Sequence, residues 1–179
     1  KEETVKTEQQ PQKAAPVLVE KPVYDVCKRI FDIVMSALAL IVLSPVFLVV
    51  AIAIKAQDGG NVFYASTRLT KGGKEFKMYK FRSMRQGKAN EAVFRGDENR
   101  IFPFGAFIRA SKIDELPQLI NIFIGDMSIV GPRPAAVDQM SVVRAGKYAL
   151  VSRETAGLTG PSALYDYIYG DTVENAEDY

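Results

Sequence analysis

Residues 33–54 read IVMSALALIVLSPVFLVVAIAI and carry no charged side chain. As a straight α-helix this run would be about 33 Å long, at roughly 1.5 Å per residue, which is close to the thickness of the hydrocarbon core of a bilayer. A helix buried inside a water-soluble protein is rarely so long and so uniformly apolar. The run therefore predicts a helix that inserts into a membrane.

Ser44-Pro45 interrupts this run near its centre. Proline removes one backbone hydrogen bond and clashes with the preceding turn, so we expect a kink there. Cations lie on both sides of the run, and they give no clear orientation under the positive-inside rule. The residues alone leave two interpretations equally open: a re-entrant helix that enters and leaves on one face, or a single pass with a mild kink. Lys28, Arg29 and Asp32 precede the run, and the last two are spaced for an i,i+3 ion pair.

The composition restricts the chemistry that this chain can use. Hydrophobic residues make up 47% of the 179 residues, which is enough for one domain with a core. The chain has no histidine and a single cysteine, Cys27, which excludes Ser-His catalysis, histidine-ligated metals, cysteine zinc sites and an internal disulfide. Any metal is then a hard ion such as Mg²⁺. The basic stretch 55–85 predicts an anionic partner, and the membrane segment argues against nucleic acid as that partner.

Two segments on either side of the turn 71–74 predict a β-hairpin, because Val62–Arg68 and Glu75–Ser83 are rich in aromatic and β-branched residues. On the second strand, Lys80 and Arg82 follow two apolar residues on the same face. This order, apolar residues followed by cations, is typical either of a strand that runs from the core to an anion-binding site or of a strand end exposed to solvent. By contrast, residues 1–20 are polar and lack periodicity, and we expect a disordered tail there.

Two adjacent carboxylates, Asp114 and Glu115, precede an apolar pattern with helical spacing. Pro117 is expected in the first turn of that helix, which places both carboxylates at the helix start, where the dipole favours negative charge. One interpretation is a helix cap, worth about 1–2 kcal/mol. The other is a nucleophile, Asp114, whose pKa the helix start lowers, beside a Glu115 that holds Mg²⁺. The pattern consists of Leu116, Leu119, Ile120 and Phe123.

Arg133 lies between Pro132 and Pro134, which hold the backbone extended and rigid. A guanidinium fixed in this way suits bidentate phosphate binding, although a proline-rich turn with an exposed arginine gives the same pattern. Further along, Gly157–Pro161 is predicted to be a turn, preceded by Lys147 and Arg153. The chain contains neither a Walker loop nor a GxGxxG motif.

Five motifs that occur here in order resemble those of the monotopic phosphoglycosyl transferases, the bacterial sugar transferase family. The resemblance covers residues 28–160, which is most of the chain. The motifs are Lys28-Arg29 with Asp32, the apolar run broken at Ser44-Pro45, Lys80–Met84, Asp114–Leu119 and Val130–Pro134.

The resemblance implies an α+β fold, in which a small mixed helical domain with a short β-hairpin is anchored by a re-entrant, Ser-Pro-broken membrane helix. Residues 21–57 would form the membrane segment, and residues 58–179 a catalytic domain on the cytoplasmic face of the bacterial inner membrane. Family members usually continue past the position of Tyr179, so a domain truncated at its C-terminus is expected. Where the family often has Pro-Gly, this chain has Ala156-Gly157.

The same resemblance implies transfer of a sugar 1-phosphate from a UDP-sugar to polyprenol (undecaprenyl) phosphate, the first step of glycoconjugate assembly. Asp114 would attack the β-phosphate, form a covalent sugar-phosphate ester and release UMP, while Glu115 would bind Mg²⁺. Lys80, Arg109 and Arg133 would bind the phosphates, and Pro132 and Pro134 would shape the nucleotide pocket. The alternative is an inactive, membrane-anchored UDP-sugar-binding or scaffold protein. The sequence does not determine the sugar, the pathway or the oligomeric state.

Overall fold

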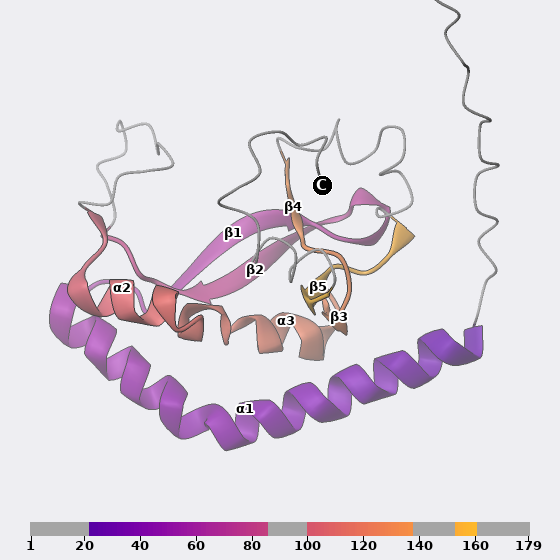
Figure 1. Cartoon of the computed structure of the whole chain (residues 1–179), viewed down its shortest axis with the longest axis horizontal. Helices are drawn as coiled ribbons and strands as arrows, with labels where there is room; N and C mark the ends of the chain where they lie inside the picture. The colour runs from indigo at the N-terminus through magenta and orange to yellow at the C-terminus, as the bar shows by residue number, and fades with distance from the viewer. Residues whose placement is uncertain (1–21, 86–99, 138–152, 161–179) are drawn as a thin grey trace, which may run out of the picture.

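The computed structural model describes residues 22–85, 100–137 and 153–160, so the predicted tail lies outside the described residues. Helices and strands are mixed, as expected for an α+β fold, and α3 lies between α1 and the hairpin strand β2 (Figure 1). The strands form an antiparallel sheet of order β2-β1-β4 and a parallel pair β3-β5. In chain order the elements are α1 (Pro22–Asp58), β1 (Phe63–Leu69), the 3-10 helix η1 (Lys71–Gly73), β2 (Glu75–Phe81), α2 (Pro103–Ala110), the 3-10 helix η3 (Ile113–Glu115), α3 (Gln118–Ile124), β3 (Ser128–Val130), β4 (Ala135–Ala136) and β5 (Gly157–Thr159).

α1 is a single helix of 37 residues that continues through Pro45. Pro45 has no N–H group for the carbonyl oxygen of Ile41, and the Ser44 hydroxyl donates to that oxygen at 2.7 Å instead. The serine thus compensates for the bond that the proline removes, and the helix bends without breaking. Figure 1 shows the result as two straight arms joined by a bend in the middle part of α1.

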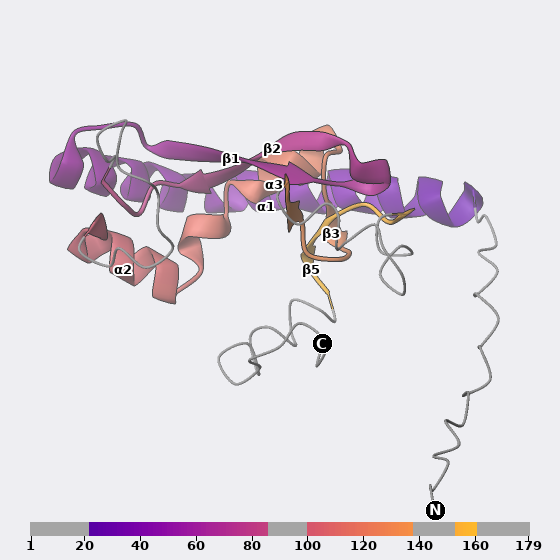
Figure 2. The ribbon, with the colours of Figure 1, turned by 90° about the horizontal axis from the view of Figure 1, so that it is seen from above.

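Both arms of α1 pack against the same side of the domain, which lies within the concave side of the bent helix (Figures 1 and 2). Leu40 and Leu43 of the first arm contact a core cluster that joins β2 to α3. Val50 and Ile54 of the second arm are buried in another cluster, with residues of β2 and α2. The outer face of α1 exposes large apolar side chains along most of its length, which is unusual for a surface in contact with water. By length and composition α1 is able to cross a membrane.

The predicted hairpin is confirmed, with strand ends within two residues of those expected. β1 and β2 pair antiparallel in a register that places Tyr64 opposite Lys80. The turn between them is the short helix η1, where Gly72 and Gly73 adopt positive φ angles of 70° and 72° that favour glycine.

The helix predicted to begin at Asp114 and Glu115 begins later than expected. Pro117 cannot donate to the preceding turn, and the chain forms 3-10 hydrogen bonds around it, from Leu116 N–H to the Ile113 carbonyl and from Ile120 N–H to the Pro117 carbonyl. α3 starts only at Gln118. The predicted apolar face is also wrong at its end, because Phe123 is 45% exposed. The buried face of α3 consists of Gln118, Leu119, Asn121 and Ile122.

The predicted turn at Gly157–Pro161 is a strand over its first three residues. Ser128 N–H donates to the Ala156 carbonyl and Gly131 N–H to that of Thr159, which pairs β5 with β3. The two backbones approach so closely at Gly131 that a Cβ atom there would lie 2.3 Å from the Thr155 carbonyl oxygen. Only glycine fits at this close contact between the two backbones. The contact holds the start of the Pro132-Arg133-Pro134 segment against β5.

Candidate active site

The two adjacent carboxylates lie in η3, between α2 and α3. Asp114 is 8% exposed and Glu115 is partly buried. Lys80, near the end of β2, donates to Glu115 Oε1 at 2.7 Å. The structure therefore brings together a lysine and two carboxylates that are 34 and 35 residues apart along the chain.

The backbone next to the carboxylates has an unusual conformation. Lys112 lies in the left-handed region at φ 58°, the one such non-glycine residue among those that the structure describes. Its N–H group donates to the Arg109 carbonyl, and its carbonyl oxygen accepts from Glu115 N–H. This turn ends the segment that follows α2 and directs the chain into η3. A left-handed lysine costs roughly 1 kcal/mol or more, and such strain is often found at functional sites.

The surrounding charges act differently on the two carboxyl groups. Burial raises the pKa of Asp114, and the neighbouring Glu115 raises it further, against the opposing effect of Lys80, Arg109 and Lys112. Burial alone would also raise the pKa of Glu115, but the ion pair and hydrogen bond from Lys80, helped by Arg133 and Lys112, lower it overall. One of the two interpretations of the sequence included a lowered pKa for Asp114, and the direction is the opposite, because tertiary burial outweighs any effect of the helix start.

Four cations thus act on the two carboxylates, and they come from four separate elements. Lys80 belongs to β2, Arg109 to the last turn of α2, Lys112 to the turn before η3, and Arg133 to the exposed segment after β3. Such a group of cations suits an anionic ligand with more than one phosphate. Three of the four were predicted from the sequence as phosphate-binding residues, and Lys112 was not.

The remaining predicted residues lie around this centre. Arg82 is 5% exposed and packs against Gly60, where a Cβ atom would lie 2.1 Å from its Nη1 atom. The largest effects on the pKa of both carboxyl groups come from burial and from other charges. Pro132 and Pro134 flank Arg133 and are half-buried, and the Pro132 carbonyl accepts from Gly157 N–H at 2.7 Å. Arg153 is exposed, whereas Lys147 lies outside the described residues.

Sequence reasoning missed two buried polar residues that join the elements around this site. Asn121 is fully buried in α3, and its side chain joins α3 to β2 by two hydrogen bonds. Ser128 of β3 is also buried and contacts the carboxylate of Asp32 at 2.7 Å. The one available signal for Asn121 was a polar amide inside the apolar run Leu119–Ile124.

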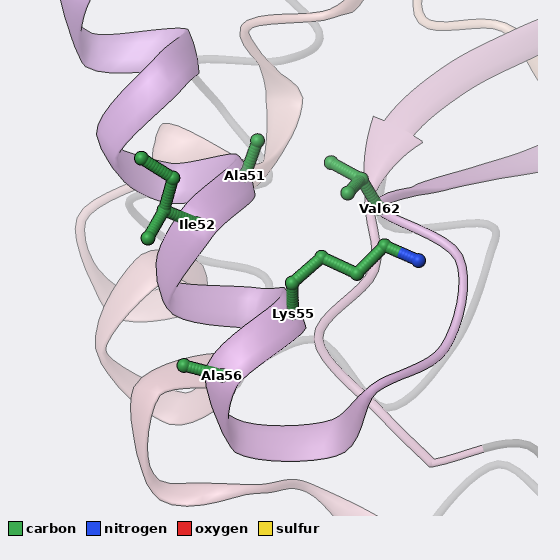
Figure 3. Close-up of a pocket in the computed structure, with 5 residues that line it drawn as sticks. All are labelled: Ala51, Ile52, Lys55, Ala56 and Val62. Atoms are coloured by element: carbon green, nitrogen blue, oxygen red, sulfur yellow. The ribbon is translucent and has the colours of Figure 1, made fainter.

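A separate, open recess of about 480 Å³ lies where α1 approaches the start of β1. Figure 3 shows that it is lined mainly by short or apolar side chains, with the ammonium of Lys55 at its edge. The carboxylates of η3 do not line this recess. Its lining residues are Ala51, Ile52, Lys55, Ala56 and Val62.

Comparison with known proteins places this site in a family. The sequence profile described as bacterial sugar transferase matches residues 23–177. The chain belongs to this family. The match contains all five motifs and every residue of the site described above. The family resemblance inferred from the sequence is therefore confirmed.

Among curated members of the family, the exopolysaccharide production protein ExoY of Sinorhizobium fredii is 39% identical over 158 residues, which cover 78% of this chain and 69% of that protein. The UDP-glucose:undecaprenyl-phosphate glucose-1-phosphate transferase of Klebsiella pneumoniae is 40% identical over 157 residues, which cover 85% of this chain but only 34% of the relative. A relative from Aeromonas hydrophila, named for N-acetylgalactosamine phosphate transfer to undecaprenyl phosphate, is 41% identical over 119 residues, or 65% of this chain and 28% of that protein.

The Lys80–Glu115 pair gives a pH-dependent prediction for stability. A carboxyl group with a lowered pKa stabilises the folded state above its ordinary pKa of 4.5, and this stabilisation is lost as the pH falls through the folded value. Lys80→Gln should therefore lower the free energy of unfolding at pH 7, and its difference from wild type should shrink below pH 4.5. Lys80 also lowers the pKa of Asp114, which adds to the difference with the same sign.

Denaturant unfolding in mild detergent at several pH values measures this difference. Lys77→Gln is the matched control, because Lys77 is an exposed lysine of the same strand that bonds to the Thr67 hydroxyl. Its effect should be small at every pH. A Lys80→Gln effect that does not change with pH would show that the ion pair is not its cause.

Proposed function

We propose that this chain transfers a sugar phosphate from a UDP-sugar to polyprenol phosphate at a membrane surface. The observation that carries the proposal is the buried Asp114 beside the Lys80–Glu115 pair, with three further cations acting on one or both carboxyl groups. The relatives from Klebsiella pneumoniae and Aeromonas hydrophila are named for UDP-sugars and undecaprenyl phosphate, which supports the same substrate classes here.

In the proposed reaction, a carboxylate oxygen of Asp114 attacks the β-phosphorus of the UDP-sugar. A new P–O bond forms to Asp114, the bond from the β-phosphorus to the bridging oxygen breaks, and UMP leaves with that oxygen. A phosphate oxygen of the polyprenol phosphate then attacks the same phosphorus and displaces the Asp114 carboxylate. Lys80, Arg109 and Arg133 would neutralise phosphate charge in both steps.

Asp114 must be ionised to attack, and its raised pKa makes the nearby cations important. Lys80, Arg109 and Lys112 all oppose the effect of burial on this carboxyl group. A carboxylate that is poorly solvated but held ionised is a stronger nucleophile than one in water. Burial next to cations therefore supports Asp114, rather than the lysine-paired Glu115, as the attacking group.

The donor set is consistent with Mg²⁺ only if the substrate helps to bind the ion. No group of three or more acidic, histidine or cysteine side chains suited to a metal occurs within the described ranges. Mg²⁺ is commonly held by one or two carboxylates together with substrate phosphates, which the adjacent Asp114 and Glu115 are able to provide. We infer that Glu115 holds the ion, which would neutralise negative charge on the diphosphate.

The path of α1 supports a re-entrant insertion. Its two arms pack on one side of one domain, and the polar residues of that domain cannot follow a helix across a bilayer (Figure 1). We infer that α1 enters and leaves the membrane on the same face, with the active site at the depth of lipid phosphates. We place that face on the cytoplasmic side of the inner membrane, as the family resemblance implies.

The proposal is tested with the chain in lipid nanodiscs, supplied with a panel of UDP-sugars, undecaprenyl phosphate and Mg²⁺. Release of UMP with formation of a lipid-linked sugar is the expected result. With labelled UDP-sugar and no acceptor, the label on the sugar phosphate should stay on the protein after denaturation. Binding of UDP-sugars without UMP release, with or without acceptor, would favour the scaffold alternative.

A further inference from the structure

Three charged residues in the first arm of α1, Lys28, Arg29 and Asp32, bind the domain. The carboxylate of Asp32 is 4% exposed, and it accepts hydrogen bonds from the Ser128 hydroxyl at 2.7 Å and from Ile129 N–H at 3.0 Å. Lys28 lies 3.6 Å from the same carboxylate and also donates to the Ser128 hydroxyl. The i,i+3 pair predicted between Arg29 and Asp32 does not form, because the carboxylate is bound to β3 and to Lys28.

Arg29 binds the end of α3. Its Nη1 donates to the Ile122 carbonyl at 2.7 Å and its Nη2 to the Phe123 carbonyl at 2.8 Å. Its guanidinium also lies against Gly125, where a Cβ atom would come within 3.1 Å of Nη2. Carbonyl groups in the last turn of a helix lack intrahelical donors and carry partial negative charge, so a planar cation with two parallel donors fits them well.

The two elements bound in this way are those that carry the active-site charges. β3 runs directly into Gly131-Pro132-Arg133, and Arg133 acts on Glu115. α3 follows η3, which holds both carboxylates. A shift of the first arm of α1 would therefore move Arg133 and η3 relative to the membrane.

We propose that Lys28, Arg29 and Asp32 form a docking cluster that positions β3 and α3, and with them the active site, on the membrane helix. Lys28 and Arg29 are then positioning residues and not anchors for lipid head groups. The effect on catalysis rests on the proposed function, whereas the docking itself does not.

Lys55, at the other end of the apolar run, differs from Lys28 and Arg29 because it is exposed. It lies at the edge of the recess in Figure 3, and its ammonium is 3.4 Å from the Gly59 carbonyl.

The chain provides its own reporter of docking, since Cys27 is its single cysteine, is exposed and directly precedes Lys28. A spin label on Cys27 should be immobile in wild-type nanodiscs and mobile in Arg29→Gln and Asp32→Asn. Lys55→Gln is the matched control and should leave the label immobile. Equal immobility in all four proteins would overturn the docking cluster, whatever the outcome of the transfer assay.

Arg29→Lys separates docking from lipid binding, because it keeps the charge but cannot bridge two carbonyls with parallel donors. We expect kcat for sugar-phosphate transfer to fall about tenfold in Arg29→Lys and further in Arg29→Gln, to the same extent in zwitterionic and in anionic lipid. Full activity of Arg29→Lys, or a loss confined to anionic lipid, would identify Arg29 as a head-group anchor and overturn the proposal. Retained partition of both variants into nanodiscs shows that they are folded and inserted.

Discussion

Asp114→Asn should reduce the rate of UMP release at least about 10³-fold, which corresponds to roughly 4 kcal/mol of activation free energy. The amide has almost the same shape as the carboxylate, but it has no negative charge and forms no phosphate ester. The cations around it remain, so UDP-sugar binding should persist or strengthen once one repulsive charge is gone. Glu115→Gln should slow the reaction less, by about 10²-fold, because it affects charge neutralisation and not bond formation.

Initial rates and UDP-sugar affinities of the two variants, measured side by side, give the comparison. If Glu115→Gln stops transfer while Asp114→Asn retains it, the nucleophile is Glu115 and the assignment is wrong. Stability provides a control with a known sign. A carboxyl group with a raised pKa costs stability once it is ionised, so Asp114→Asn should be at least as stable as wild type at pH 7. A loss of activity in this variant is then not a loss of folding.

Local sequence signals predicted the parts of the fold that local interactions determine. The hairpin is such a case, because two glycines with positive φ and strands of aromatic and β-branched residues lie within 19 residues. The bend of α1 is another, because the proline and the serine that compensates for it are adjacent. The apolar run was sufficient to predict one long helix, but not that both of its arms pack under one domain.

The features that sequence reasoning missed depend on contacts between distant segments. The pKa of Asp114 follows from burial, which the residues of η3 do not determine by themselves. β5 pairs with β3, nearly thirty residues earlier in the chain, and in isolation its Gly-Leu-Thr sequence is typical of a turn. Arg29 and Asp32 have the spacing of an ion pair, yet their partners on α3 and β3 are more than ninety residues away.

Asn121 supplies the prediction with the largest effect on stability. Its Oδ1 accepts from Tyr79 N–H at 3.0 Å, and its Nδ2 donates to the Lys77 carbonyl at 2.7 Å. Asn121→Leu keeps the number and branching of the side-chain heavy atoms but leaves both backbone groups of β2 without a partner. At about 1–3 kcal/mol for each group, we expect a loss of about 2–6 kcal/mol in the free energy of unfolding. Denaturant unfolding in detergent measures this loss.

The same substitution should also slow catalysis in the molecules that remain folded. Asn121 bonds α3 to β2 at Lys77 and Tyr79, and Tyr79 directly precedes Lys80. We therefore expect Asn121 to help hold the Lys80 ammonium at Glu115. Ile54→Ala is the matched control, because Ile54 is fully buried in the other core cluster and its truncation also costs about 2–5 kcal/mol. Per folded molecule, Ile54→Ala should keep the kcat of wild type, whereas the kcat of Asn121→Leu should fall at least about tenfold. In Asn121→Leu the pKa of Glu115 should also rise toward 4.5, because the contact with Lys80 loosens. If the two folded variants have equal rates, Asn121 has a role in stability only, and contacts other than its side-chain amide hold Lys80 in place.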